Sequence, residues 1–345
     1  MKKTKLNILY QSNDSYAAIT GVSMYSLFKN NTDIDELTVY LLDDGISKEN
    51  LNKFKKLGKE YNRQINIIDS KEILKKVKEF NLVPYKGTYT TYFKLFAFGF
   101  IQTNNDILMQ LDGDTIITGS LKDLCNIDMS NNAIAATFDC IHNGYKKMIN
   151  IPENEGYYNC GVMLINQKLW RKNKYEERIK QHLNNIRNKY FIVDQDIVNV
   201  LFRNEIKYLD LTYNFNSGFY IYGIDNIEKI YKLKEPYFHN KDLIKKRIKN
   251  PLIIHCMGAM TGRPWEEESI HPQTELFDKY LYESLWKDYK KIKPKRSIVF
   301  KIQKTLYKIL PKSLYAYIHR YSQYLYLYLN NKNVLKWKKI IHLQF

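Results

Sequence analysis

Hydrophobic positions in the first part of the chain alternate between short apolar runs and helix-spaced patterns. The run Leu6–Tyr10 ends in polar residues, which is typical of a buried strand. Tyr16–Phe28 then carries apolar side chains at helical spacing, and Leu37–Leu42 is a second apolar run. This order predicts a mainly parallel, doubly wound α/β sheet, in which ligands bind beyond the carboxyl ends of the strands. The first loops to inspect for a site are those after Tyr10, Leu42 and Leu111.

The same alternation continues along the chain. We expect Ser47 to cap a helix that runs to about Tyr61, and Ser70 to cap a helix that follows a third strand at Gln64–Ile68. The remaining elements expected from the pattern are strands at Asp106–Leu111, Val162–Ile165 and Leu252–Ile254, and helices at Thr91–Phe100, Tyr175–Asn188 and Asp194–Leu201.

Composition indicates a protein with a sizeable core, since 44% of its 345 residues are hydrophobic. The four Cys residues form no C-x-x-C pair, which argues against a disulfide framework or a zinc ribbon and favours a reducing compartment. The apolar run near the N-terminus is too short for a secretory signal, and no uncharged apolar run has the ~18 residues that a membrane span needs. We therefore expect a cytoplasmic protein.

Charge divides the chain into two parts. The net charge is +18, and residues 291–345 hold thirteen Lys or Arg and no Asp or Glu, which leaves only +5 for the first 290 residues. We expect a globular domain at residues 1–290 and a separate basic tail at residues 291–345.

The basic tail carries aromatic and aliphatic residues between its cations. A loosely helical pattern at Ile298–Leu310 is interrupted by Pro311, and Tyr315–Leu329 is dense in Tyr and Leu. This is typical of an amphipathic segment that binds an anionic membrane surface. A helical subdomain packed on the globular domain is the alternative, and nucleic-acid binding is not expected.

The sharpest local feature is an apolar run, Ile107–Leu111, that stops at Asp112-Gly113-Asp114. The chain has two other D-x-D sequences, but neither lies at the carboxyl end of a predicted strand. Two carboxylates at such an end suit Mg²⁺ or Mn²⁺ bridging to phosphates, and Gly113 permits close backbone approach. A turn with solvated acids is the alternative.

A second apolar run ends at His255, a side chain that can bind a metal. A partly buried His satisfied by its neighbours is the alternative. Gly258 and Arg263 follow, and a turn that combines glycine with a cation suits a pyrophosphate. Farther back in the chain, Asp194 opens a predicted helix and could simply be its N-cap.

Six blocks of sequence, taken in order, resemble the retaining nucleotide-sugar glycosyltransferases of family 8, and more narrowly their bacterial lipopolysaccharide galactosyl/glucosyltransferase branch. The resemblance covers roughly residues 5–265. It implies a GT-A type fold, with a donor-binding half at about 1–120 and an acceptor-binding half at about 121–290. The blocks are Ile8–Ala18, Thr90–Phe98, Ile107–Ile117, Tyr157–Asn166, Asp194–Ile197 and His255–Trp265.

The resemblance also implies roles for individual residues. Asp112, Asp114 and His255 would hold Mn²⁺, or Mg²⁺, against the diphosphate of a UDP-hexose donor. The nucleotide would further contact Gln11, Ser12, Asn13, Tyr16, Gly113, Gly258 and Arg263. The donor sugar would contact Lys94, Asp139, Asn159, Asp194 and Gln195.

Three positions depart from the family pattern. Asn13 stands where an acidic residue is common, and Lys94 stands where Arg is common, so that charge is kept but the fork geometry is lost. Arg263 stands where Lys is usual, and two extra residues precede it.

The implied activity is transfer of galactose or glucose from a UDP-sugar to a cell-surface glycan or lipid-linked saccharide, with retention, at the cytoplasmic face of the membrane. Retention needs either a covalent intermediate or attack from the face of departure. Asp194 is the nearest candidate nucleophile for the first route. The amide at Gln195 favours the second route, with the leaving phosphate oxygen accepting the acceptor's proton.

Two other functions stay open at the level of sequence. Asp112-Gly113-Asp114-Thr115 also fits a phosphohydrolase of the haloacid-dehalogenase type, with Asp194 and Asp196 as the later metal-binding pair. A non-catalytic scaffold that keeps the fold and binds the membrane is the other rival, favoured only by Asn13 and Lys94.

Overall fold

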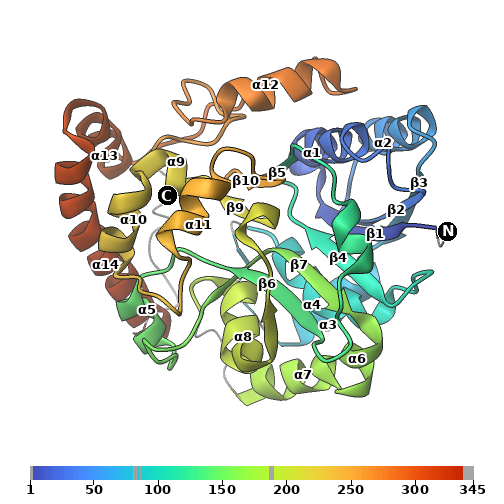
Figure 1. The fold of residues 1–345 in the computed structure, drawn as a ribbon, viewed down its shortest axis with the longest axis horizontal. Helices are drawn as coiled ribbons and strands as arrows, with labels where there is room; N and C mark the ends of the chain where they lie inside the picture. Colours follow the sequence, from blue (N-terminus) through green and yellow to red (C-terminus); the bar gives the residue numbers. More distant parts are fainter. Residues whose placement is uncertain are drawn as a thin grey trace.

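The computed structural model describes residues 3–336 except 81, 83, 86, 186–189 and 259, and only the backbone of residues 326, 327 and 330–336. In this part of the chain, a seven-stranded sheet of order β3-β2-β1-β4-β7-β6-β8 carries helices on both faces (Figure 1). A second sheet has three strands in the order β5-β10-β9.

The strands are β1 (Lys5–Ser12), β2 (Glu36–Asp43), β3 (Gln64–Asp69), β4 (Ile107–Leu111), β5 (Thr115–Ile117), β6 (Ile134–Phe138), β7 (Tyr158–Asn166), β8 (Ile206–Tyr208), β9 (Phe215–Asn216) and β10 (Ile253–His255). The helices are α1 (Ala17–Lys29), α2 (Lys48–Glu60), α3 (Lys71–Glu79), α4 (Phe93–Phe100), α5 (Asn143–Met148), α6 (Gln167–Lys172), α7 (Tyr175–Asn185), α8 (Val193–Phe202), α9 (Gly218–Tyr222), α10 (Ile224–Tyr231), α11 (Lys241–Arg247), α12 (Thr274–Glu283), α13 (Ile298–Ile309) and α14 (Lys312–Lys336).

The large sheet is mixed and mainly parallel, as predicted. β1 pairs in parallel with β2 and β4, so that Leu9 lies between Tyr40 and Gln110. β7 then runs antiparallel between β4 and β6. The carboxyl ends of β1, β2 and β4 therefore lie at one edge of the sheet, which is where the sequence pattern predicts ligand binding.

Alternation of side chains along β1 separates two hydrophobic cores. Leu6, Ile8 and Tyr10 pack with α1, α2 and α12 on one face of the sheet. Leu9 points to the other face and packs with α3, α4, α6, α7 and α8. Figure 1 shows α1 and α2 on one side of the strands and α8 on the other. Burial on both faces explains why β1 appears in the sequence as a mainly apolar run, with Asn7 as the one polar residue between Leu6 and Tyr10.

Of the two serines predicted to cap helices, one does so and the other does not. Ser47 accepts a hydrogen bond from the Asn50 amide and caps α2 as expected. The prediction for Ser70 is wrong, because its hydroxyl donates to the Asp43 carbonyl instead of accepting from α3. Asp194 is not an N-cap either, since α8 begins after Ile192 and the Asp194 carboxylate is engaged elsewhere.

The basic tail folds back on the globular domain as two helices, α13 and α14, and α14 packs beside α10 and α5 (Figure 1). Phe300, Tyr315 and His319 are buried there, and the His319 imidazole is hydrogen-bonded to the Tyr222 hydroxyl at 3.0 Å. None of the helices in the described part of the chain has both the length and the hydropathy that a membrane crossing needs.

Candidate metal and donor site

Two carboxylates and an imidazole meet beyond the carboxyl end of β4. Asp112 and Asp114 follow β4 directly, and His255 ends β10. The small sheet brings them together, because Thr115 pairs with His255 and the Cys256 amide donates to the Asp114 carbonyl. One donor atom from each of the three residues lies within 4.8 Å of the others, and the described residues contain no second group of this kind. Hard oxygens with one imidazole nitrogen fit a divalent cation.

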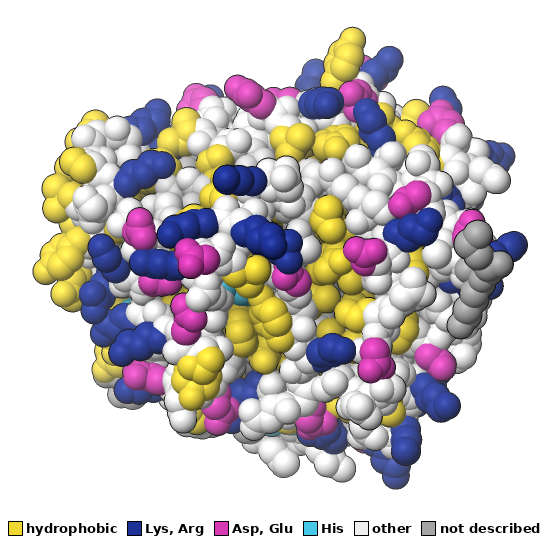
Figure 2. Space-filling view, in the orientation of Figure 1, with side chains coloured by type: hydrophobic (Ala, Val, Ile, Leu, Met, Phe, Trp, Pro, Cys, Tyr) yellow, Lys and Arg dark blue, Asp and Glu magenta, His cyan; other side chains and the backbone are white. Residues whose placement is uncertain are grey.

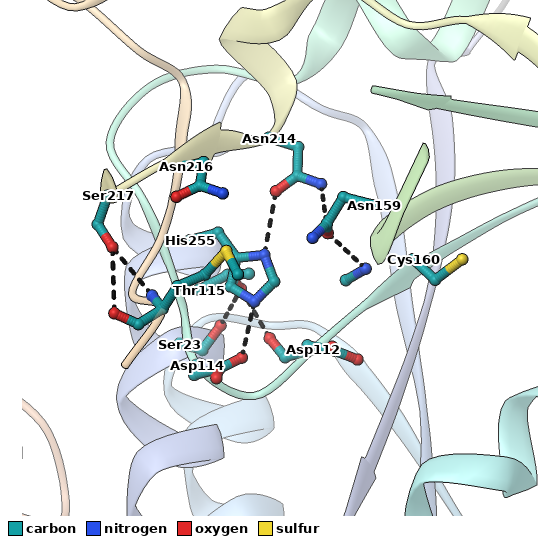
Figure 3. A network of polar contacts seen from close by, with 12 residues as sticks. Ser23, Asp112, Asp114, Thr115, Asn159, Cys160, Asn214, Asn216, Ser217 and His255 are labelled. Carbon is teal, nitrogen blue, oxygen red and sulfur yellow. Dashed lines mark hydrogen bonds and ion pairs between the residues drawn. The ribbon is translucent and has the colours of Figure 1, made fainter. Parts of the chain in front are cut away.

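The orientation of His255 is fixed by a chain of amides (Figure 3). The Asn214 amide nitrogen donates to Asn159 Oδ1 at 2.9 Å, which leaves Asn214 Oδ1 as an acceptor for His255 Nδ1 at 3.2 Å. Nδ1 therefore carries a proton, and Nε2 faces Asp114 Oδ1 at 3.2 Å. This turns the nitrogen of His255 that could bind a metal toward the carboxylates, the arrangement that outer partners impose in metal sites.

Two glycines are required by close packing at the site. A Cβ on Gly113 would lie 2.4 Å from the Thr20 hydroxyl oxygen in α1. A Cβ on Gly161 in β7 would lie 2.2 Å from His255 Cε1. A larger residue at Gly113 would have to displace the Thr20 side chain, and one at Gly161 would have to displace the His255 imidazole.

Asp114 lies between His255 and a second cation. The Arg263 guanidinium donates to Asp114 Oδ2 at 2.5 Å and to the Tyr16 hydroxyl at 3.4 Å. Burial alone would raise the pKa of Asp114, but His255 and Arg263 together hold it well below its usual range. Gly258 lies against this side chain, since a Cβ there would be 2.9 Å from Arg263 Nε. The loop after β10 thus brings Gly258 and Arg263, the predicted diphosphate-binding residues, to the cluster of Asp112, Asp114 and His255.

Lys94 is buried between two carboxylates. Its Nζ lies 3.0 Å from Asp112 Oδ1 and 3.1 Å from Asp194 Oδ2, and its side chain is 2% exposed. Burial lowers the pKa of Lys94, but the two carboxylates outweigh that effect and raise it. Gln110 also donates to Asp112 Oδ1, at 2.6 Å. Lys94 therefore holds Asp112 in place and neutralises Asp194.

The loop after β1 lies at the same edge of the sheet. Gln11 accepts a hydrogen bond from the Lys94 amide at 3.2 Å, and the Ser12 hydroxyl accepts one from Thr20 at 3.2 Å. Asn13 Oδ1 accepts from the Tyr16 amide at 3.1 Å and so caps the short helix that precedes α1. Contact of these residues with a nucleotide stays a prediction.

Gln195 is held at both ends of its amide. Its Oε1 accepts from the Cys160 amide at 3.0 Å, and its Nε2 donates to Asp139 Oδ2 at 2.8 Å. Asp139 Oδ1 in turn accepts from Asn216 at 3.2 Å. The structure therefore joins Gln195 and Asp139, but leaves their predicted contact with a sugar untested.

The two acids at the start of α8 have separate partners. Thr91 donates to Asp194 Oδ1 at 2.7 Å, and Lys94 pairs with the other oxygen. Asp196 accepts from the hydroxyls of Tyr145 and Tyr157, and burial raises its pKa to about 6. Asp194 and Asp196 thus bind different neighbours. This arrangement gives no support to the metal-binding pair of acids that a phosphohydrolase of the dehalogenase type would need.

Sequence reasoning missed several residues of this site. Asn214 directly precedes the two-residue strand β9 and orients His255. Asn216 lies within β9 and orients Asp139. The alternation Asn214-Phe215-Asn216 was the available signal, since it places two amides on one face of a strand. Gln110, which braces Asp112, carried no signal because its side chain lies within an apolar run.

Comparison with known proteins agrees with this geometry. The sequence profile described as glycosyl transferase family 8 matches residues 7–269. The chain is 29% identical over 290 residues to a lipopolysaccharide 1,2-glucosyltransferase of Escherichia coli K12, covering 82% of this chain and 79% of the relative. It is 24% identical over 294 residues to a lipopolysaccharide 1,3-galactosyltransferase of Salmonella typhimurium, covering 82% and 79% of the two chains.

A solved structure of the galactosyltransferase LgtC with donor and acceptor sugar analogs shares the fold. Its TM-score is 0.64 at 24% identity, covering 81% of this chain and 96% of that one. The profile match spans most of the chain and includes every residue placed at the cluster. The chain is a glycosyltransferase and belongs to family 8.

Proposed function

We propose that this enzyme transfers glucose or galactose, with retention, from the UDP-sugar to a saccharide acceptor of the lipopolysaccharide type. The observation that carries the proposal is the cluster of Asp112, Asp114 and His255, with His255 Nε2 turned toward the carboxylates and Arg263 beside them. The names of the relatives support the acceptor class, and they include both a glucosyl- and a galactosyltransferase. The proposal therefore covers both sugars.

Asp112, Asp114 and His255 would hold Mn²⁺, or Mg²⁺, which supplies positive charge where the leaving diphosphate becomes negative. Arg263 would bind that diphosphate as a fork and stabilise the same charge. In the step we propose, the bond from C1 to the phosphate oxygen breaks as the acceptor oxygen bonds C1 on the same face. The acceptor's proton passes to the leaving phosphate oxygen.

Two contacts support attack from the face of departure over a covalent intermediate. A nucleophile must present a free oxygen to C1, whereas Asp194 is 5% exposed and pairs with Lys94 and Thr91 through its two oxygens. Gln195 is an amide whose oxygen already accepts from Cys160. Detection of a glycosyl adduct on Asp194 or Gln195 by intact-protein mass spectrometry would contradict this route.

The test of the proposed activity is release of UDP from UDP-glucose and UDP-galactose, with and without Mn²⁺, in the presence of a saccharide acceptor. We expect release with one of the two donors, retention of the α configuration by NMR, and loss of turnover in Asp114→Asn. Asp33→Asn is the matched control, because Asp33 belongs to another D-x-D sequence and lies exposed beside Ser120. Turnover without metal, or an inverted product, would refute the proposal.

We further propose that α13 and α14 attach the enzyme to the inner face of the plasma membrane. The outward face of these helices leaves hydrophobic side chains exposed, and Figure 2 shows such side chains along the left edge with Lys and Arg beside them. Tail cations near an anionic surface can contribute about 1 kcal/mol each. The exposed residues are Ile298, Val299, Ile302, Ile309, Leu314, Tyr317, Ile318, Tyr321, Tyr324, Leu325 and Leu329.

Deleting the tail is a poor test of membrane attachment, because Phe300, Tyr315 and His319 are buried against the globular domain. The better variant carries Ile302→Ser and Tyr321→Ser on the exposed face. We expect it to sediment less with anionic vesicles, and the wild type to bind neutral vesicles weakly.

The matched control for vesicle binding is Tyr282→Ser, because Tyr282 is 78% exposed on α12 and lies outside the tail. Its sedimentation should equal that of the wild type. Equal binding of wild type and the tail variant would refute attachment through this face.

A further inference from the structure

Arg296, at the start of the basic tail, is bound to the loop that carries Arg263. Its guanidinium pairs with the Glu266 carboxylate, and the two side chains are only 14% and 11% exposed. Arg296 also lies over the Phe300 ring, with 4.2 Å from Cζ to the ring centroid. This ion pair is therefore among the better shielded of the structure and is fixed on the tail side by an aromatic contact.

Glu266 in turn fixes the backbone of the Arg263 turn. The oxygen that pairs with Arg296, Oε2, accepts a hydrogen bond from the Arg263 amide at 2.9 Å, and the Glu266 amide donates to the Arg263 carbonyl at 3.0 Å. Gly262 precedes this turn with a φ of +80°, and a Cβ there would lie 2.8 Å from Glu266 Oε2. The carboxylate thus occupies the concave side of the turn and sets the direction in which Arg263 leaves it.

The segment before α13 is held against the same loop by its backbone. The Glu267 amide donates to the Ile292 carbonyl at 2.8 Å, and the Ile292 amide donates to the Trp265 carbonyl at 3.2 Å. Lys304 in α13 donates to the Glu268 carbonyl at 2.7 Å. The beginning of the tail therefore forms one wall of the loop after β10, although the sequence separates the two by about 30 residues.

We propose that Arg296 is a positioning residue for the donor diphosphate and acts through Glu266 on Arg263. With Arg296 in place, the Glu266 carboxylate is neutralised and stays under the turn, so that the Arg263 side chain extends toward Asp114 and Tyr16. Without Arg296, a buried carboxylate loses its only charged hydrogen-bond donor in the described structure, and the turn relaxes to bring it another donor or water. The inference rests on the proposed binding of a UDP-sugar.

This assignment changes the role of the tail. Its first residues complete the donor site, whereas the outward face of α13 and α14 is proposed to meet the membrane. Loss of the tail should therefore weaken donor binding in solution, where no membrane is present.

The test is the affinity of the full-length enzyme for UDP with Mn²⁺, measured by titration calorimetry in four forms: wild type, Arg263→Ala, Arg296→Ala and the double variant. We expect Arg296→Ala to weaken UDP binding about tenfold, a size within the usual range of coupling between neighbouring groups. The double variant should bind no more weakly than Arg263→Ala alone. Arg296→Lys should restore part of the affinity.

Arg178→Ala is the matched control. Arg178 pairs with Glu205 at 2.6 Å and lies over the Phe202 ring at 4.7 Å, so it has the same kinds of partner away from the donor site. We expect it to lower the thermal midpoint while leaving UDP affinity unchanged.

Two outcomes would overturn the inference about Arg296. One is an Arg296→Ala variant that binds UDP as the wild type does, and the other is a double variant whose losses add. Failure of the wild type to bind UDP at all would instead refute the proposed function, so that the two failures are distinguishable.

Discussion

Replacing Lys94 by Met should destabilise the fold strongly and in a pH-dependent way. The Lys94 side chain is 2% exposed, and its ammonium lies 3.0 Å and 3.1 Å from the carboxylates of Asp112 and Asp194. Met has a similar length and no charge, so the variant leaves these carboxylates without their cation. Removing one partner from a buried ion pair costs about 3–5 kcal/mol. We expect a loss of this size in the free energy of unfolding at pH 8.

The loss should shrink as the pH falls. Burial already raises the pKa of Asp194 above its usual value, and Lys94 is the main group that opposes this rise. In the Met variant, native Asp194 therefore takes up a proton at higher pH than in the wild type. For each pH unit over which native Asp194 is protonated in the variant but not in the wild type, the variant regains about 1.4 kcal/mol in its free energy of unfolding relative to the wild type. The gap between the two proteins should therefore narrow between pH 8 and pH 5.

The assay is urea unfolding at several pH values, with the slope against urea checked for constancy. Asp194→Asn added to Lys94→Met should recover part of the lost free energy, because it removes the more deeply buried of the two uncompensated charges. Lys29→Met is the control, since Lys29 pairs with Glu283 on the surface and should cost under about 1 kcal/mol. A loss below about 1 kcal/mol for Lys94→Met at pH 8, or one independent of pH, would refute the reasoning.

Three further predictions follow from the same contacts. Asn214→Ala should weaken Mn²⁺ binding about 10- to 100-fold, because it frees the His255 ring. Electron paramagnetic resonance with UDP present measures this affinity, and the control Asn226→Ala, at a position remote from the site, should leave it unchanged. Gly161→Ala should cost about 1–3 kcal/mol in urea unfolding because its Cβ meets that ring, and an unchanged midpoint would contradict this. Stability should fall as the pH drops from about 6.5 to 4, because burial lowers the pKa of four buried His to about 4, so that in this range they bind protons mainly when unfolded. Asp194 and Asp196 oppose the trend, because burial raises the pKa of both carboxyls. A flat calorimetric midpoint over that range would count against these assignments, which concern His142, His239, His271 and His319.

The fold was predictable from the sequence wherever burial produces a regular pattern. β1 and β2 are covered on both faces, so each appears as an apolar run, and α1 shows helical spacing beside them. Helix caps were less predictable, because a serine hydroxyl at a helix start can form its hydrogen bond with a group outside the helix. Ser70 donates to Asp43 across the sheet, a contact that no local pattern contains.

The candidate site was predictable to the extent that its residues end strands. Asp112 and His255 each follow an apolar run, and the carboxyl ends of strands are where such a sheet binds ligands. Asn214 was missed because its alternation with Phe215 and Asn216 covers only three residues, too few to stand out as a strand beside the two-residue β9. The ion pair of Glu266 and Arg296 could not be predicted, because it is a tertiary contact between the loop after β10 and the basic tail. The charge distribution along the sequence had indicated that the tail was separate from the globular domain.

The tail packs on the globular domain, whereas its binding to a membrane stays a prediction. Tyr315 and His319 face α10 and are buried, as a packed subdomain requires. Tyr317 and Tyr321 lie on the same helix and are 61% and 56% exposed, as a membrane-binding face requires. A helix dense in Tyr and Leu on all sides cannot be assigned to one partner from its sequence.

The measurement that tests the central claim most directly is thermal unfolding of the full-length protein with UDP and Mn²⁺, beside UDP with EDTA and beside Asp114→Ala. A ligand at a hundred times its dissociation constant adds about 2.7 kcal/mol to the native state. We predict a midpoint rise of several degrees that needs the metal, needs Asp114 and is absent with ADP. A rise that persists in EDTA or in Asp114→Ala, or no rise at all, would contradict the assignment of Asp112, Asp114 and His255 as the metal and donor site.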